Sequence, residues 1–332
     1  MFDSNTAAQW GVEFKNIDVG AVNLQVAVAG TGPLIILVHG FPECWYSWRH
    51  QIRPLTEAGY QVAAPNVRGY GDSAKPQDIR AYDMQSLTAD MAGLRMAVSP
   101  EKPAIIIGHD WGAPIAWNSA LLYPQLFSAV AGLSVPHVPP GDTVAIDLFQ
   151  RVFTDQGKFF YMVYFQNEGV AEAELSADPQ RSIRLFFTAL GGDAAAGAWP
   201  VDKPYDRSLF DQMIEPLMPR KWFTHDDLTY YAGIFEKCGF RGPLNRYRNF
   251  HRDSDFLRKQ GKKIIQQPSL YVIGEHDMVA QMYPAGPAVA MQKYAGNAHR
   301  DFTLPGCGHW TQQERPQEVN KILLDWLASL PE

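Results

Sequence analysis

The arrangement of apolar and polar positions along the chain predicts alternating strands and helices. Two uninterrupted aliphatic runs, at 34–38 and 104–107, are typical of strands that are buried on both faces of a sheet. Shorter apolar runs, and a loosely alternating pair of segments on either side of Gly20, predict further strands. These further strands cover 12–19, 23–29, 61–67, 128–134, 269–273 and 301–304.

In several segments between these strands, the spacing of apolar residues predicts helices. The predicted helices cover 45–58, 83–98, a stretch between Gly108 and Tyr123, and 316–330, and Asp83 is placed to cap the second of them. Strands that alternate with helices in this way predict an α/β fold, with a mostly parallel sheet flanked by helices.

The alternation is lost between residues 138 and 250. This segment is rich in aromatic residues and contains helical runs at 142–153 and 180–190. We interpret it as a mainly helical cap inserted into the sheet-forming part. The predicted organisation is therefore a first core segment over 1–137, a cap over 138–250 and a second core segment over 251–332.

Composition and charge narrow the class of protein. With 332 residues, of which 46% are hydrophobic and 19% charged, the chain has ample material for a packed core. A net charge of −6 gives no electrostatic reason to bind nucleic acid or an anionic membrane, and no apolar run is long enough to span a bilayer. The three cysteines are scattered, and no basic patch precedes an apolar run at the start of the sequence. We therefore expect a cytoplasmic protein without disulfides.

The GHDWG sequence at 108–112 carries the most chemical information. It follows a predicted strand, precedes a predicted helix, and matches the glycine-flanked turn that exposes a nucleophile at the carboxyl edge of a sheet. The central residue is Asp110, whose carboxylate is ionised at neutral pH and can attack an sp³ carbon to form an alkyl ester. The simpler interpretation is that Asp110 caps the helix that follows.

Three further motifs favour the catalytic interpretation of Asp110. The HGFPE sequence at 39–43 follows the first buried strand, where such folds place a second oxyanion donor. Asp277 ends a later strand, and His309 lies in a glycine-rich loop after the last one. Each motif also has an ordinary structural explanation as a turn or a packed histidine. Their order, nucleophile then acid then histidine, is the one that α/β-hydrolases require.

The sequence closely resembles the epoxide hydrolases of the α/β-hydrolase superfamily, with a single catalytic domain and a helical cap. The matching motifs are HGFPE at 39–43, RGYGDS at 68–73, GHDWGA at 108–113, YFQ at 164–166, GPLN at 242–245 and GHWTQ at 308–312. They occur in family order over nearly the whole chain. The resemblance implies an α/β-hydrolase fold and hydrolysis of an organic epoxide to a vicinal diol.

The resemblance also implies a role for particular residues. Asp110 would form a covalent ester with a ring carbon, and His309, oriented by Asp277, would activate the water that hydrolyses it. The family uses two cap tyrosines as donors to the epoxide oxygen, and they correspond here to Tyr161 and Tyr247. In the YMVYFQ sequence at 161–166, Tyr164 could be mistaken for Tyr161.

The immediate surroundings of the nucleophile complete the expected site. Backbone N–H groups of Phe41 and Trp111 would form the oxyanion hole. Their side chains, with Tyr161 and Tyr247, would contact a small apolar epoxide. Besides this substrate and water we expect no nucleic acid or membrane partner, and a homodimer is left open.

No cofactor or metal is expected. The sequence at 69–74 matches a loose dinucleotide fingerprint, but Pro76 follows at once and no helix can begin cleanly there. Adjacent Glu275, His276 and Asp277 cannot all face one metal ion.

Two other functions remain open at this point. A haloalkane dehalogenase would share the aspartate, the histidine and the ester, and Trp111 could bind the halide, although a halide has no need of two tyrosine donors. A fluoroacetate-type dehalogenase would have an arginine where Trp111 stands. A catalytically silent binding protein on the same fold would usually have lost one of the catalytic residues, and here all are present.

Overall fold

The protein is built on one eight-stranded sheet. The computed structural model describes residues 4–200, 202–216, 218–296 and 298–331. The strands lie in the order β1-β2-β4-β3-β5-β6-β7-β8; β1 and β2 form a hairpin, β2 pairs antiparallel with β4, and all later pairs are parallel. Their bounds are β1 Glu13–Asp18, β2 Asn23–Ala29, β3 Leu34–Val38, β4 Gln61–Pro65, β5 Ala104–His109, β6 Phe127–Leu133, β7 Ser269–Gly274 and β8 His299–Leu304. The predicted mostly parallel sheet is confirmed.

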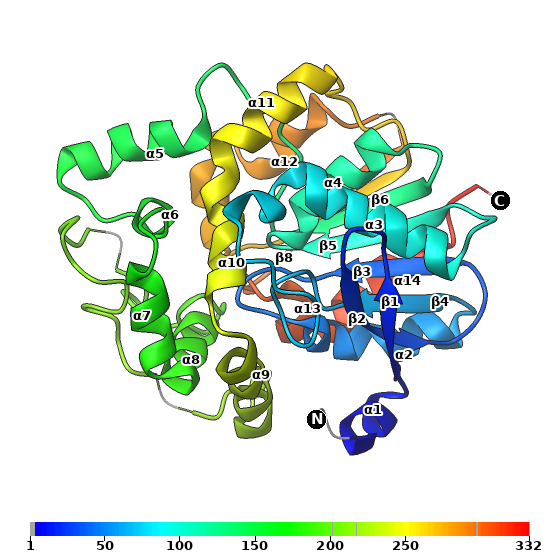
Figure 1. The fold of residues 1–332 in the computed structure, drawn as a ribbon, viewed down its shortest axis with the longest axis horizontal. Helices are drawn as coiled ribbons and strands as arrows, with labels where there is room; N and C mark the ends of the chain where they lie inside the picture. Colours follow the sequence, from blue (N-terminus) through cyan, green and yellow to red (C-terminus); the bar gives the residue numbers. More distant parts are fainter. Residues whose placement is uncertain (1–3, 201, 217, 297, 332) are drawn as a thin grey trace.

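Helices cover the sheet in two groups (Figure 1). The helices α3 and α4 pack against each other, and so do α2 and α14, while the short α1 packs on α2. Their bounds are α1 Ser4–Trp10, α2 Arg49–Glu57, α3 Met84–Val98, α4 Gly112–Leu122 and α14 Pro316–Leu327. The predicted Asp83 cap is confirmed, because its carboxylate accepts the N–H of Ser86 at 2.8 Å.

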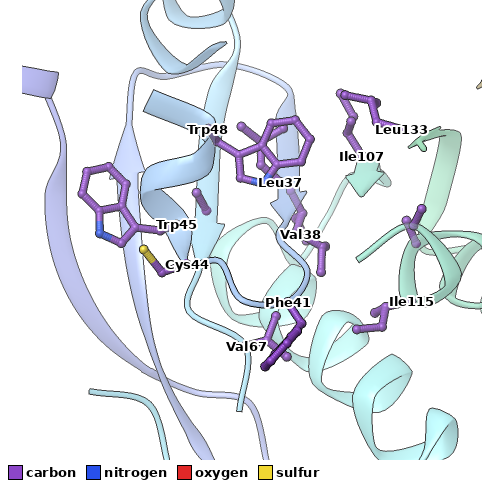
Figure 2. Packing of buried hydrophobic residues seen from close by; sticks show 14 of the residues in the cluster. Leu37, Val38, Phe41, Cys44, Trp45, Trp48, Val67, Ile107, Ile115 and Leu133 are labelled. Atoms are coloured by element: carbon purple, nitrogen blue, oxygen red, sulfur yellow. The ribbon is translucent and has the colours of Figure 1, made fainter. Parts of the chain in front are cut away.

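The core lies where the central strands meet these helices. Every residue of β3 and of β5 is buried, which explains their unbroken aliphatic runs. Figure 2 shows Leu37 and Val38 of β3 beside Ile107, Leu133 and Ile115 from the neighbouring strands and α4. Burying each of these side chains contributes about 1.5–3 kcal/mol to folding. The strands are therefore a rigid platform for the loops at their carboxyl ends.

Besides shifts of a few residues at other element ends, the segments at 45–58 and 61–67 differ from the prediction. The segment at 45–58 begins as a 3₁₀ turn, η1 (Trp45–Trp48), and only then becomes α2. All four residues of η1 are buried, so this turn lacks the exposed face that amphipathic spacing assumes. The strand predicted at 61–67 ends at Pro65, a residue that has no N–H to donate to a neighbouring strand.

The segment between β6 and β7 is helical, and its first helices lie together beside the sheet-forming part (Figure 1). The helices are α5 Ala145–Val152, α6 Tyr161–Tyr164, α7 Val170–Ala177, α8 Pro179–Ala189, α9 His225–Cys238, α10 Arg241–Asn245 and α11 Phe250–Gln260. The helical runs predicted at 142–153 and 180–190 correspond to α5 and α8. The 3₁₀ turn η4 (Arg246–Asn249) joins α10 to α11, so helical backbone continues across residue 250.

Candidate active site

Asp110 occupies a tight turn between β5 and α4. Its φ of +50° lies in the left-handed region, which is unfavourable for a residue with a Cβ. The flanking glycines are required by space, because a Cβ on Gly108 would collide with the carbonyl oxygen of Gly112, and one on Gly112 with that of Val38. The turn thus places a single carboxylate at the carboxyl edge of the sheet.

The Asp110 carboxylate accepts a hydrogen bond from the loop after β3. The N–H of Phe41 donates to Asp110 Oδ1 at 2.8 Å. Gly40 allows this approach, since a Cβ there would meet the Asp110 side chain. The helix-cap interpretation of Asp110 is wrong, because the N-cap residue of α4 is Trp111 and no side chain caps this helix.

Asp110, His309 and Asp277 meet at the sheet edge as a connected series. Nε2 of His309 lies 3.4 Å from Asp110 Oδ2, and Nδ1 of His309 lies 3.0 Å from Asp277 Oδ1. Asp277 Oδ1 also accepts the N–H of Val279 at 3.0 Å, so Asp277 stabilises its own turn as well. The structure therefore brings together the three residues that the sequence placed on separate strand ends.

Both carboxylates influence the charge of His309. Burial by itself would lower the pKa of His309, but Asp277 and Asp110 raise it well above its usual value. Burial would raise the pKa of Asp277, but the charge and hydrogen bond of His309 lower it.

A narrow cavity opens onto Asp110 and His309. Its volume is about 30 Å³. The described residues that line it are Phe41, Asp110, Tyr161, Phe186, Leu190, Trp199, Tyr247, Met278, Val279 and His309. Apart from Asp110, His309 and the polar atoms of Tyr161, Tyr247 and Trp199, the lining consists of apolar side chains. An apolar lining favours contact with uncharged organic groups.

Tyr161 and Tyr247 reach the cavity from the helical segment. Tyr161 begins α6 and Tyr247 lies in η4, and their ring centroids are 6.1 Å apart. Burial, together with the negative charge of Asp110, raises the pKa of each tyrosine well above its usual value. The hydroxyl of Tyr164 instead donates to Glu174 at 2.7 Å. The geometry thus favours Tyr161 over Tyr164 as the partner of Tyr247.

The two predicted oxyanion residues differ in the position of their side chains. The Phe41 ring lines the cavity and contacts Tyr247, with ring centroids 5.5 Å apart. The Trp111 indole lies beneath the Arg246 guanidinium at 4.4 Å and lines a separate cavity of about 10 Å³. A direct contact between the Trp111 side chain and substrate stays a prediction.

Sequence reasoning missed a buried pair behind the nucleophile. Glu43 Oε2 accepts the N–H of Gly40 at 2.7 Å and lies 2.8 Å from Nδ1 of His109. Nε2 of His109 lies 2.7 Å from the carbonyl oxygen of His309. Both partners of His109 are hydrogen-bond acceptors. Glu43 and His109 stand inside the recognised motifs, but nothing in those motifs shows that they touch.

Ser134 was also missed. It directly follows β6, and its hydroxyl lies 3.0 Å from Nδ1 of His309. Its φ of +73° is unusual for a serine, and its carbonyl oxygen accepts the Tyr271 hydroxyl at 2.7 Å. In the sequence, the only sign of this contact is that a single serine stands at the end of a predicted strand.

Neither a metal nor a dinucleotide site is apparent in the part of the chain that the structure describes. No group of three or more His, Cys, Asp or Glu residues there could hold a metal ion. The loop at 69–74 has glycines with positive φ at Gly69 and Gly71, and it leads into the 3₁₀ turn η2 (Ile79–Tyr82) rather than a helix that could bind a phosphate. Among the same residues, none of the helices combines the length and the apolar composition that a membrane span requires.

Comparison with known proteins gives consistent matches over almost the whole chain. A family model described as the alpha/beta hydrolase fold matches residues 33–316. Epoxide hydrolase A of Mycobacterium tuberculosis is 41% identical over 318 residues, covering 95% of this chain and 97% of the relative. Bifunctional epoxide hydrolase 2 of Mus musculus is 38% identical, covering 93% of this chain and 54% of its own length. The crystal structure of epoxide hydrolase A from Mycobacterium thermoresistibile superimposes with a TM-score of 0.90 at 42% identity, covering 96% of this chain and 99% of that one.

Proposed function

The chain belongs to the α/β-hydrolase fold family and, within it, to the epoxide hydrolases, and we propose that Asp110, His309, Asp277, Tyr161 and Tyr247 carry its reaction. The enzyme hydrolyses an epoxide to a vicinal diol. The observation that supports these residue roles best is the convergence of Asp110, the His309–Asp277 pair and two buried tyrosines on one apolar cavity. Its apolar lining favours a small, uncharged epoxide.

In the first step, Asp110 opens the epoxide ring. One carboxylate oxygen bonds to a ring carbon while the bond from that carbon to the epoxide oxygen breaks. The departing oxygen takes a proton from Tyr161 or Tyr247, and the other tyrosine donates a hydrogen bond to it. Because an alkoxide is strongly basic, a donor aimed at this oxygen contributes on the order of 10²–10³ in rate. The raised pKa of both tyrosines keeps these protons in place.

In the second step, water hydrolyses the ester. His309 removes a proton from water as the water oxygen attacks the ester carbonyl carbon, and N–H groups of Phe41 and Trp111 stabilise the oxyanion. Collapse breaks the bond from the carbonyl carbon to the ester oxygen, and the departing alkoxide takes the remaining proton of the attacking hydroxyl, so that the diol is released and the Asp110 carboxylate is restored. The proton on His309 returns to the deprotonated tyrosine. Ester formation removes the negative charge of Asp110, so one cause of the high pKa of His309 disappears when a base is needed.

The alternative functions receive less support. A halide site built on Trp111 would require its indole to line the cavity beside Asp110. The indole contacts Arg246 and Tyr247 and lines a separate cavity. A catalytically silent binding protein would not require a connected nucleophile, histidine and acid.

The cysteines support a cytoplasmic location. Cys44, Cys238 and Cys307 are free, as is usual for proteins of a reducing compartment such as the cytoplasm.

Replacing the base tests these roles. His309→Gln should form the ester once and fail to hydrolyse it, so mass spectrometry should find one substrate mass on the peptide that contains Asp110. Asp110→Asn should form no adduct, and His225→Gln, a change of an exposed histidine on α9, should turn over normally. No adduct in His309→Gln, or an adduct on another residue, would refute the assignment. Halide release from a bromoalkane by the unaltered enzyme would instead favour the dehalogenase.

A further inference from the structure

The catalytic histidine loop is attached directly to the helical cap. Leu190, which follows α8 and lines the cavity, accepts the N–H of His309 through its carbonyl oxygen at 2.9 Å. Two residues further on, Gly192 lies so close to Gly308 that a Cβ on either would collide with the backbone nitrogen of the other. One wall of the cavity and the loop that carries the base therefore form a single backbone junction.

Glu314 holds this junction together. Its Oε2 accepts the N–H of Gly192 at 2.8 Å and that of Gly308 at 2.9 Å, and its Oε1 accepts the N–H of Trp310 at 3.0 Å. One carboxylate thus binds the residues on both sides of His309 and also the cap segment. A carboxylate supplies acceptors only, so it matches three converging N–H groups.

The surrounding contacts show that this junction is well packed. The Trp310 indole donates to the carbonyl oxygen of Phe187 in α8 at 2.9 Å, and the two rings stack with centroids 4.3 Å apart. Burial raises the pKa of Glu314, and the three N–H groups oppose that effect. A group that is desolvated in this way interacts strongly with its donors.

We propose that Glu314 is a positioning residue, which sets His309 against its partners by tying the His309 backbone to the cap wall at Leu190. The inference rests on the proposed two-step function. Ester hydrolysis should depend on Glu314, because the His309 ring must reach both Asp277 and the attacking water. Ring opening should depend on it far less, because Asp110 is held by Phe41 and the tyrosines come from α6 and η4.

Glu314→Gln is the first test. The amide nitrogen would face a backbone N–H, so at least one of the three hydrogen bonds is lost at nearly unchanged volume. Rapid-quench mass spectrometry should show ester formation near the unaltered rate and ester hydrolysis slowed between about tenfold and a hundredfold, as expected for a displaced base. The ester should therefore accumulate during turnover. Glu318→Gln, which changes an exposed carboxylate at the start of α14, is the matched control and should alter neither step.

Gly192→Ala perturbs the same junction from the cap side. The added Cβ would meet the carbonyl oxygen of Gly306 and the nitrogen of Gly308. It should slow the same step, and it serves as the test if Glu314→Gln does not fold. Hydrolysis at the unaltered rate in the folded variant, or an equal loss in both steps, would overturn the inference.

The reference variant His309→Gln separates this inference from the proposed function. If it traps the ester and Glu314→Gln behaves like the unaltered enzyme, only the role of Glu314 is refuted. If it traps no ester, the two-step function itself is refuted, and with it the premise of the inference.

Discussion

His309 lies between the carboxylates of Asp110 and Asp277. Asp277 is buried, and in the proposed mechanism it keeps its charge throughout, whereas Asp110 loses its charge when it becomes an ester. In the free enzyme both raise the pKa of His309, which favours an imidazolium beside Asp110. In the ester only Asp277 remains, so the ring gives up its proton more readily. In the proposed mechanism, the charge of the nucleophile thus determines when the base becomes available.

Asp110→Asn imitates the uncharged ester at nearly the same volume. The pKa of His309 should fall in this variant, because the charge of Asp110 and its hydrogen bond are both removed. Titration of the imidazole signals by nuclear magnetic resonance measures the change. Asp206→Asn, which alters an exposed carboxylate in the helical segment, should leave the titration unchanged. An unchanged titration in Asp110→Asn would contradict the coupling.

The tyrosine assignment can be tested residue by residue. Tyr247→Phe or Tyr161→Phe should each slow ring opening by on the order of 10²–10³, because a donor to the developing alkoxide is removed. Tyr164→Phe is the matched control, since its hydroxyl donates to Glu174 rather than into the cavity. Single-turnover rates of ester formation decide the outcome. If Tyr164→Phe alone were harmful, the assigned register of α6 would be wrong.

At the level of elements, local sequence predicts the turns. It does not predict polar contacts between residues that are far apart in the chain. The Asp110 turn could be predicted because two glycines and a strand-to-helix change lie within five residues. The Glu43–His109 pair could not, because its members are 66 positions apart. The Glu314–Gly192 contact spans 122 positions and depends on how the cap folds back. Hydrophobic periodicity specifies which face of an element is buried, and it does not specify which polar groups meet there.

The buried Glu43–His109 pair should contribute to stability in a pH-dependent way. Burial would raise the pKa of Glu43, but His109 and the N–H of Gly40 lower it from 4.5 to about 2. Because the pKa is lower in the folded state, the stabilisation is present above about pH 4.5 and is lost as the pH falls toward 2.

Glu43→Gln tests this contribution. It should lower the free energy of unfolding by about 3 kcal/mol at pH 7, because it leaves His109 without its carboxylate. Urea unfolding at pH 7 and at pH 3.5 should show that the difference from the unaltered protein shrinks in acid. Glu57→Gln, in an exposed ion pair with Arg53, should change stability little at either pH. A difference that is the same at both pH values would contradict the assignment.

At the scale of the whole molecule, the parallel sheet brings distant residues together. Strands β5, β7 and β8 end at the same edge, so the turn after β5, the turn after β7 and the loop after β8 deliver Asp110, Asp277 and His309 to one place. The helical segment between β6 and β7 closes this edge and supplies Tyr161 and Tyr247. In the proposed mechanism, the loops at this edge thus provide the groups that make and hydrolyse the ester, and the helical segment provides those that protonate the opening ring.

The proposed mechanism requires that Asp110, and not water, attacks the epoxide. A single turnover in water labelled with ¹⁸O, with enzyme in excess, distinguishes the two. If Asp110 attacks, the water oxygen enters at the ester carbonyl, so the peptide that contains Asp110 should carry ¹⁸O and the first diol should be unlabelled. An ¹⁸O-labelled diol together with an unlabelled Asp110 peptide would show direct attack by water and would refute the role of Asp110.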